Sequence, residues 1–392
     1  MSYLVLARKL RPQRFQDLVG QDSIWKTLLN AFAQDRVAHA FLFTGPRGTG
    51  KTSCARILTK ALNCKNPQNY EPCNVCEHCV EISQGIAADV MEIDAASNRG
   101  IEHIRELRAS VKFSPAKFPY KTYIIDEVHM LTTESFNALL KTLEEPPSHV
   151  KFILATTDHH KVPTTVISRC QRYDFHNIEV GEMSAYLAEV AHKEGINISA
   201  SSLAMISRSS VGGMRDALTT LDMLIGFCGS DIDDGKVIEI LGLNEQREVD
   251  ALLTGIMYKD LEMVMENLHY LIKKGRSFGQ LLNDMMTAVK DVTLIKELGL
   301  SKVYWKDFLP DQAELYQNLA DMAGKAELHG YFQILLELET QVKRSSQAQA
   351  CMEMGMIRMA RAESIKGVAE VIQLLEQVAG PDHALKKKSL LN

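Results

Sequence analysis

The sequence has no long apolar run and no excess of positive charge. None of its hydrophobic stretches approaches the about 20 residues that a membrane-spanning helix needs. The first nine residues have neither the apolar core nor the cleavage site of a secretory signal, so we expect a cytoplasmic protein. The net charge of −5 argues against broad, unaided nucleic-acid binding, although it leaves room for a local basic surface. Internal repeats and low-complexity tracts are also absent from the 392 residues, which suffice for two or three domains.

Cysteine is unevenly distributed. Four of the eight cysteines form a C-x8-C-x2-C-x2-C pattern: Cys64, Cys73, Cys76 and Cys79. In a cytosolic chain such clustering favours a metal over disulfides, and four thiolates complete a tetrahedral, structural Zn²⁺ site. An iron–sulfur cluster or unliganded cysteines remain alternatives, but the x3-C-P continuation of ferredoxins is replaced by Val80-Glu81-Ile82-Ser83. Because four cysteines already complete the shell, we expect His78 to be a surface residue.

A glycine-rich motif organises the first part of the chain. It reads G-x-x-x-x-G-K-[ST] and consists of Gly45, Pro46, Arg47, Gly48, Thr49, Gly50, Lys51 and Thr52. The apolar stretch 40–44 before it reads as a strand, and residues 52–62 after it read as a helix, which is the context of a phosphate-binding loop. Glycines let successive backbone N–H groups face the phosphates, Lys51 can reach the terminal phosphates, and the Thr52 hydroxyl can ligate Mg²⁺.

Two further strand ends supply polar groups. Residues 122–127 read as an apolar strand that ends in Asp126 and Glu127. We expect Asp126 to hold Mg²⁺ and Glu127 to orient and deprotonate the attacking water. The strand predicted at 150–155 is followed by Thr156 and Thr157. A hydroxyl there could sense the γ-phosphate, position the attacking water, or be only a polar strand end.

The remaining pattern predicts a parallel sheet followed by helices. Strands at 90–94 and 172–175 alternate with helices, as a parallel sheet covered on both faces requires. From residue 180 onward the pattern is helical only. Arg215 opens one of these helices, where a cation opposes the helix dipole, so it either binds a nucleotide phosphate or pairs with a nearby Asp. Arg99, in a turn, could meet a phosphate backbone or be solvated, and the basic arm at 8–21 could cover the base.

Several of these stretches together resemble one family. They are Lys9-Leu10-Arg11-Pro12, the phosphate loop, the inserted cysteines, the DEVHML stretch from Asp126, the LLKTLEEPP stretch from Leu139, Ala155-Thr156-Thr157-Asp158, Ser168-Arg169-Cys170 and Gly213-Met214-Arg215-Asp216-Ala217. Residues 1–240 closely resemble the gamma/tau subunits of bacterial DNA polymerase III, the AAA+ ATPases of the clamp loader. Residues 243–370 resemble the helical collar of that family more loosely.

The resemblance implies an α/β plus all-α fold. It would comprise an AAA+ domain with a parallel five-stranded sheet at 1–179, including a zinc module at 64–79, a helical lid at 180–242, a helical collar at 243–378 and a tail at 379–392. Thr157 would be sensor 1 and Arg215 sensor 2, while Arg169 would be an arginine finger for a neighbouring subunit. Ala7, Arg11 and Pro12 would hold the adenine, and Ser53 would join the phosphate loop in binding nucleotide.

The implied cofactors are ATP, Mg²⁺ and Zn²⁺. The implied partners are the delta and delta-prime subunits, other gamma/tau copies, the sliding clamp, and primer–template DNA held by its backbone. The implied enzyme is an ATP hydrolase within a DNA-directed DNA polymerase assembly. Two alternatives are another AAA+ DNA-remodelling ATPase and a non-hydrolysing scaffold subunit. The first is disfavoured by the cysteine insertion and the lack of a clear helix-turn-helix, and the second by the intact Lys51, Thr52, Asp126 and Glu127.

Overall fold

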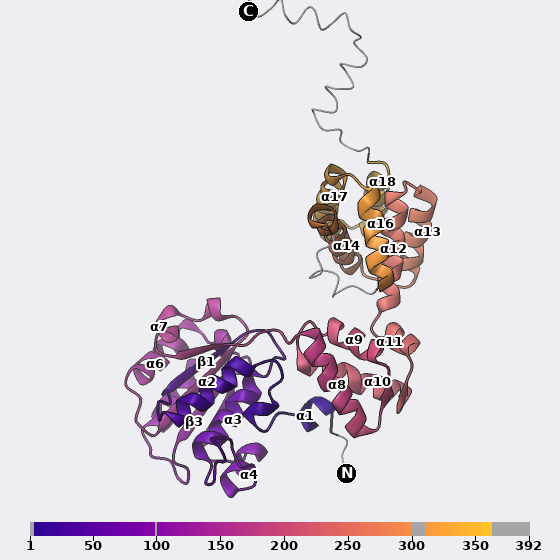
Figure 1. The fold of residues 1–392 in the computed structure, drawn as a ribbon. Helices are drawn as coiled ribbons and strands as arrows, with labels where there is room; N and C mark the ends of the chain where they lie inside the picture. Colours follow the sequence, from indigo (N-terminus) through magenta and orange to yellow (C-terminus); the bar gives the residue numbers. More distant parts are fainter. Residues whose placement is uncertain (1–3, 99, 300–309, 363–392) are drawn as a thin grey trace, which may run out of the picture. The chain divides into compact units, whose positions relative to one another are not determined.

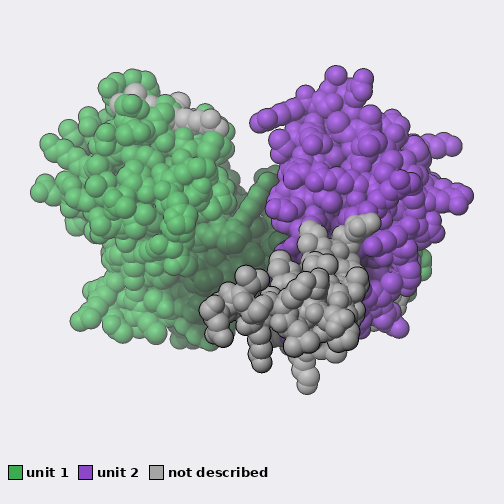
Figure 2. Space-filling model, turned by 90° about the horizontal axis from the view of Figure 1, so that it is seen from above, with its two compact units in different colours: residues 1–241 green, residues 242–392 purple. Residues whose placement is uncertain are grey.

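The computed structural model describes residues 4–98, 100–299 and 310–362, and the chain divides into two compact units, Met1–Leu241 and Gly242–Asn392. Figure 1 traces the elements of both units, and Figure 2 colours the units separately. The expectations for Arg99 and for the tail at 379–392 fall outside the described residues. Among the described helices, none is long and apolar enough to cross a membrane.

The first unit contains the predicted five-stranded parallel sheet, with strand order β2-β3-β4-β1-β5. The strands are β1 (Ala40–Thr44), β2 (Val90–Asp94), β3 (Lys121–Asp126), β4 (Val150–Thr156) and β5 (Gln171–Asp174). In the register Thr44 pairs with Thr156, and Asp94 pairs with Asp126. Because the strands are parallel and in step, the polar residues that end β1, β3 and β4 lie along the same edge of the sheet.

Helices cover both faces of this sheet, because alternate strand residues point to opposite sides. On one face Leu42, Ile125 and Leu154 pack with the buried residues of α5 (Ile101–Val111), α6 (Thr133–Glu144) and α7 (Thr164–Ile167). On the other face Phe41, Ile124 and Ile153 pack with α2 (Asp22–Ala33) and α3 (Lys51–Asn63) (Figure 1). The α/β architecture predicted from the alternation of strands and helices is therefore confirmed.

The rest of the first unit is mainly helical. It contains α8 (Val180–Glu194), α9 (Ala200–Ser209), α10 (Met214–Cys228) and α11 (Asp234–Ile240). The expectation of helices alone was wrong in one detail, because β6 (Asn197–Ile198) and β7 (Asp231–Ile232) form a short parallel ladder. Each of these strands has two residues and lies directly before the N-cap residue of a helix, Ser199 or Asp233. Two residues are too few to show the alternation of a strand in the sequence.

The N-terminal arm adds two short helical segments that the sequence did not predict. They are α1 (Leu6–Lys9) and a 3-10 turn, η1 (Phe15–Asp17). The helix α1 packs against α10, and Lys9 Nζ lies 2.7 Å from Glu194 Oε1 of α8. The arm therefore joins the mainly helical part of the unit to the sheet.

The second unit is all helical in its described residues. Its helices are α12 (Leu243–Met257), α13 (Leu261–Lys273), α14 (Phe278–Leu298), α16 (Pro310–Met322), α17 (Lys325–Arg344) and α18 (Ala348–Ala360). They bury one continuous core that includes Leu335 and Leu338 on the predicted apolar face of α17.

The remaining short elements of the first unit are α4 (Glu77–Gln84), η2 (Val128–Met130) and η3 (His159–Lys161).

Candidate nucleotide and metal sites

The glycine-rich loop lies between β1 and α3 and has the backbone that its glycines predict. Gly45, Gly48 and Gly50 all have positive φ, of 138°, 79° and 102°. A Cβ on Gly45 would also lie 2.2 Å from the Phe175 carbonyl oxygen, so no side chain fits there. The loop ends at the first turn of α3, whose backbone N–H groups and dipole favour an anion.

Lys51 is buried in this loop. Only 6% of its surface is exposed, and Nζ donates to the carbonyl oxygens of Gly45 at 2.7 Å and Pro46 at 2.6 Å. Burial lowers the pKa of Lys51, while the carboxylates of Glu127 and Asp126 act in the opposite direction. A buried ammonium group held only by carbonyl oxygens has a strong reason to bind a phosphate.

The predicted magnesium ligands lie together. Thr52 Oγ1 of α3 donates to Asp126 Oδ2 at the end of β3, at 2.7 Å. A hydroxyl and a carboxylate beside a phosphate site are the hard oxygen ligands that Mg²⁺ prefers, with further positions left to water and phosphate. The donor set therefore fits the ion.

Glu127 is held by the end of the neighbouring strand. Its Oε2 accepts from Thr157 N at 3.3 Å and from Thr157 Oγ1 at 3.0 Å. His129 Nδ1 lies 3.4 Å from the same oxygen and 3.0 Å from Thr156 Oγ1. Glu127 also has a φ of 47°, a backbone conformation that is uncommon outside glycine and clusters at functional sites.

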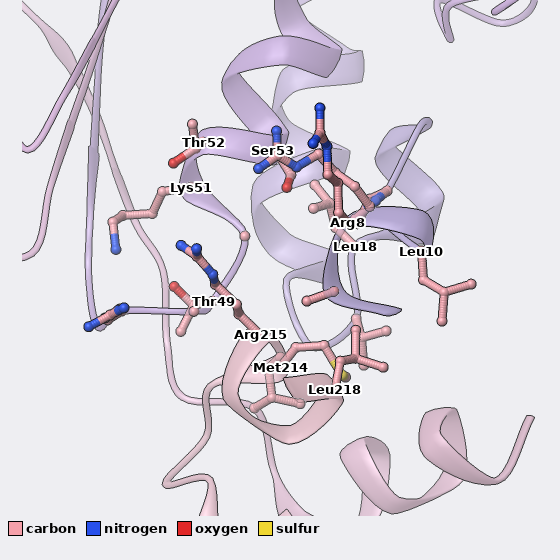
Figure 3. Close-up of a pocket in the computed structure, with 18 of the residues that line it drawn as sticks. Arg8, Leu10, Leu18, Thr49, Lys51, Thr52, Ser53, Met214, Arg215 and Leu218 are labelled. Atoms are coloured by element: carbon pink, nitrogen blue, oxygen red, sulfur yellow. The ribbon is translucent and has the colours of Figure 1, made fainter. Parts of the chain in front are cut away.

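A pocket of about 580 Å³ lies between the loop, the arm and α10 (Figure 3). Most of the predicted nucleotide-site residues line it: Ala7, Arg11, Pro12, Arg47, Gly48, Thr49, Gly50, Lys51, Thr52, Ser53, Asp126, Glu127 and Arg215. Four predicted residues are not in the described lining. Gly45 and Pro46 accept hydrogen bonds from Lys51 with their carbonyl oxygens, Thr157 donates to Glu127, and Arg169 lies elsewhere.

The pocket is rich in arginine. Burial and then the positive charges of Arg56, Arg215 and Arg8 lower the pKa of Arg11, with Glu92 acting in the opposite direction. Arg56 is fixed by two bonds to Glu92, at 2.9 and 2.7 Å. These cations repel one another, and a bound polyanion such as a nucleoside triphosphate would relieve that repulsion.

Sequence reasoning missed part of this lining. Arg8, Leu10, Asp17, Leu18 and Val19 belong to the arm at 8–21 that was expected to cover the base, but they were not singled out. The lining residues without any prediction are Val5, Arg56, Ile178, Tyr186, Met214, Leu218 and Thr219. A signal existed for some of them, because Met214 and Leu218, like Arg215 and Thr219, are four residues apart and so share a face of α10. For Tyr186 of α8 the spacing offered no signal.

Arg169 follows α7 and points to a different part of the surface. Its Nη2 lies 2.5 Å from Glu144 Oε1, and its Nη1 donates to the Thr165 carbonyl oxygen at 2.6 Å. About a third of the side chain is exposed. Within its own described chain, Arg169 therefore does not join the pocket.

The four clustered cysteines come together between α3 and β2. Their sulfur atoms all lie within 4.8 Å of one another, which suits a tetrahedral ion with metal–sulfur bonds of about 2.3 Å. Cys73 N donates to Cys64 Sγ and Cys76 N donates to Cys73 Sγ, both at 3.3 Å. Burial acts to raise the pKa of Cys73, but backbone N–H groups outweigh it and lower the pKa to about 6. The pKa of Cys76 is lowered in the same way, whereas burial raises the pKa of Cys64 and of Cys79, so a bound cation would be needed to hold all four as thiolates.

His78 is not part of this cluster, and the expectation that it lies on the surface was wrong. Only 6% of the residue is exposed. Its Nδ1 lies 2.7 Å from the Asn63 carbonyl oxygen, and its ring lies 4.4 Å from that of Phe118. The imidazole is buried because it satisfies one polar atom and packs its face on an aromatic ring.

Three family models match successive parts of the chain. Residues 20–179 match "DNA polymerase III, delta subunit", residues 182–230 match "DNA polymerase III clamp loader subunit, ATPase lid domain", and residues 232–375 match "DNA polymerase III subunits gamma and tau domain III". The first match covers the sheet, the second covers most of α8 to α10, and the third covers α11 and the described helices of the second unit.

Known proteins agree with these matches. The tau subunit of DNA polymerase III from Bacillus subtilis is 40% identical over 96% of this chain and 67% of its own length. The gamma subunit from Buchnera aphidicola of Baizongia pistaciae is 36% identical over 92% of this chain and 97% of its own length. A solved Bacillus subtilis clamp loader delta protein superposes with a TM-score of 0.41 at 12% identity, covering 87% of this chain and 99% of its own, a likeness too weak to carry an argument. On the strength of the relatives, the chain belongs to the gamma/tau family of bacterial DNA polymerase III subunits, the AAA+ ATPases of the clamp loader.

Proposed function

We propose that this chain is an ATP-driven motor subunit that opens a ring-shaped sliding clamp and loads it on primer–template DNA. The observation that carries the proposal is the pocket itself. Lys51 and Thr52 at the start of α3 and Asp126 and Glu127 at the end of β3 meet Arg215 from α10 in one lining. A nucleotide held by all of them would tie the sheet to the helical lid, so its arrival and hydrolysis would change how these two parts are held.

The chemistry would be ATP hydrolysis. Lys51 would exchange its carbonyl acceptors for phosphate oxygens, and Thr52 and Asp126 would hold the metal. Bound Mg²⁺ would neutralise charge on the transferred phosphoryl group. Glu127 would orient and deprotonate water through its carboxylate, which Thr157 orients by donating to Oε2. Thr157 would therefore act through Glu127, whereas Arg215 would contact the chain's own nucleotide directly.

Arg169 would act on a neighbouring subunit. Its bonds to Glu144 and Thr165 hold it away from the pocket of its own chain. In NTPases generally, an arginine supplied by a neighbour raises the rate of hydrolysis about 10³–10⁵-fold, because it stabilises charge in the transition state. Each site would then be slow until a second subunit docks.

The partners follow from the family. We infer assembly with delta, delta-prime and other gamma/tau copies, through a collar at 243–378, with residues 1–179 and 180–242 as motor and lid. DNA would be held by its backbone, without sequence specificity. The link to DNA-directed DNA polymerase would come through this assembly in the cytoplasm, and the chain's own reaction would be ATP hydrolysis. The cysteine cluster would hold structural Zn²⁺ with no open position for substrate.

A clamp-loading assay tests the proposal. The complete complex would be mixed with labelled clamp and primed circular DNA, and clamp retained on DNA would be separated by gel filtration. We expect retention with ATP, and a stalled complex of loader, clamp and DNA with a non-hydrolysable ATP analogue. DNA remodelling that proceeds without any clamp would instead support a different AAA+ ATPase.

A further inference from the structure

One wall of the nucleotide pocket is formed by the N-terminal arm, part of which lies outside any helix or strand. Arg11, Pro12, Asp17, Leu18 and Val19 of the arm line the pocket, but residues 10–14 belong to no helix or strand. In Figure 3 the labelled arm residues Arg8, Leu10 and Leu18 lie on the other side of the pocket from Lys51 and Thr52. A segment without its own ladder of hydrogen bonds needs external anchors to keep one conformation.

The first anchor is Glu71. This carboxylate is only 6% exposed, and it lies on the loop that carries the four cysteines. Its Oε2 accepts from Phe15 N at 2.9 Å, and its Oε1 accepts from Gln16 N at 3.2 Å. Phe15 itself is fully buried in the core beside α3, so the carboxylate fixes the arm where it enters the protein interior.

The second anchor is Lys60 of α3, which is only 2% exposed. Its Nζ donates to the carbonyl oxygen of Gln13 at 3.0 Å, to Gln13 Oε1 at 2.8 Å, and to Asn74 Oδ1 at 2.6 Å. The Asn74 amide donates back to the Gln13 carbonyl oxygen at 3.2 Å. Asn74 lies between Cys73 and Cys76 with a φ of 60°, so the turn of the cysteine cluster holds it in place.

We propose that the cysteine module positions the pocket-forming arm, with Glu71 and Lys60 as positioning residues for ATP binding. The argument has two steps. Within the arm, Asp17 Oδ2 accepts from Gln13 N at 3.1 Å and from Arg14 N at 2.9 Å. The polar contacts described between residues 13–16 and the chain outside the arm all come from α3 or from the cysteine loop, which its four clustered cysteines draw together. The module thereby supports a wall of the nucleotide pocket without lining it. The inference rests on the proposed ATP binding at this pocket.

The proposal separates two parts of nucleotide binding. Lys51, Thr52 and Asp126 belong to the sheet and the phosphate loop, and no anchor of the arm passes through them. Loosening the arm should therefore weaken binding of the nucleoside end of ATP and leave binding of the phosphate chain nearly intact. A general loss of folding would weaken both together.

The experiment uses the full chain and calorimetric titration with two probes, MgATP and inorganic triphosphate. The variants are Glu71→Gln, which removes the charge and one of the two acceptor oxygens, and Lys60→Met, which removes all three donated bonds. Glu77→Gln is the matched control, because this acidic residue of the same module is exposed and contacts only lysines among the partners described for it. Zinc content is measured for every variant.

We expect each anchor variant to bind ATP at least about tenfold more weakly, the effect of losing one or more charge-assisted hydrogen bonds. Triphosphate affinity should change less than about twofold, with zinc content and the control unchanged. Unchanged ATP affinity in both zinc-loaded variants would overturn the inference, as would a parallel fall for the two probes. If the wild-type chain bound no ATP, the proposed function would fail instead.

Discussion

Replacing Lys51 by methionine should remove most of the affinity for ATP. Methionine keeps much of the length and the apolar stem of the side chain, so the change removes mainly the charge. Lys51 Nζ is buried beside the loop carbonyls, and in the complex it would lie near a phosphate oxygen instead. Two unit charges about 4 Å apart at an effective dielectric constant of about 20 interact by about 4 kcal/mol. That corresponds to a rise of about 10³-fold in Kd.

The assay is calorimetric titration of MgATP into Lys51→Met and wild-type protein at equal ionic strength. Lys161→Met is the matched control, because this lysine is 66% exposed, pairs with Asp158 at 3.0 Å and does not line the pocket. The control should bind ATP as the wild type does. Lys51→Met protein that is folded but keeps a near-normal Kd would refute the assignment of Lys51 as a phosphate ligand.

The remaining predictions concern Arg169 and its proposed action on a neighbour, the proposed metal and one buried carboxylate. Arg169→Ala should preserve ATP binding and remove most hydrolysis in the assembled complex, and unchanged turnover there would exclude the role in trans. Metal analysis should give about one zinc per chain, and Cys76→Ser should lower it, whereas iron absorbance in the visible would overturn the zinc assignment. Asp89→Ala should cost about 2–3 kcal/mol in chemical unfolding, because Asp89 accepts three backbone N–H groups, including those of Ala116 at 2.7 Å and Phe118 at 2.9 Å. Burial acts to raise the pKa of Asp89, but these bonds outweigh it and lower the pKa. Its contribution to the unfolding free energy should therefore be present above about pH 4 and be lost as the pH falls through the folded pKa; a wild-type-to-variant difference independent of pH would contradict this.

The sheet and the phosphate site were predictable because their signals are local. A phosphate loop requires glycines, a lysine and a hydroxyl at fixed spacing, and the strand before it must be apolar to be buried. Asp126 could be placed beside Thr52 because parallel strands end at the same edge of a sheet. The structure brings these two side chains within 2.7 Å of each other.

The anchors of the arm could not be predicted in the same way. Glu71 contacts Phe15 from 56 positions away, and Lys60 contacts Gln13 from 47 positions away. Such buried polar pairs have no periodicity, and a lone Glu or Lys reads as a solvated residue. His78 was misjudged for the same reason, because its burial depends on Phe118, which is distant in the sequence.

The short secondary-structure elements were also not predicted from the sequence. The two-residue strands β6 and β7 and the four-residue helix α1 are too short to show a period of two or 3.6 residues. They exist because tertiary packing holds them: β6 and β7 pair with each other, and α1 packs on α10. The part of α10 that lines the pocket was partly readable, since Met214 and Leu218 share one helix face.

The most direct test of the central claim is the steady-state ATPase rate of the purified chain. It would be measured alone, then with the delta and delta-prime subunits, and then with the clamp and primed DNA added in turn. The account predicts a low rate alone and a strong rise only with all components, because Arg169 lies outside the pocket of its own chain. A high rate for the chain alone, or stimulation by DNA without the clamp, would contradict a motor that depends on its neighbours.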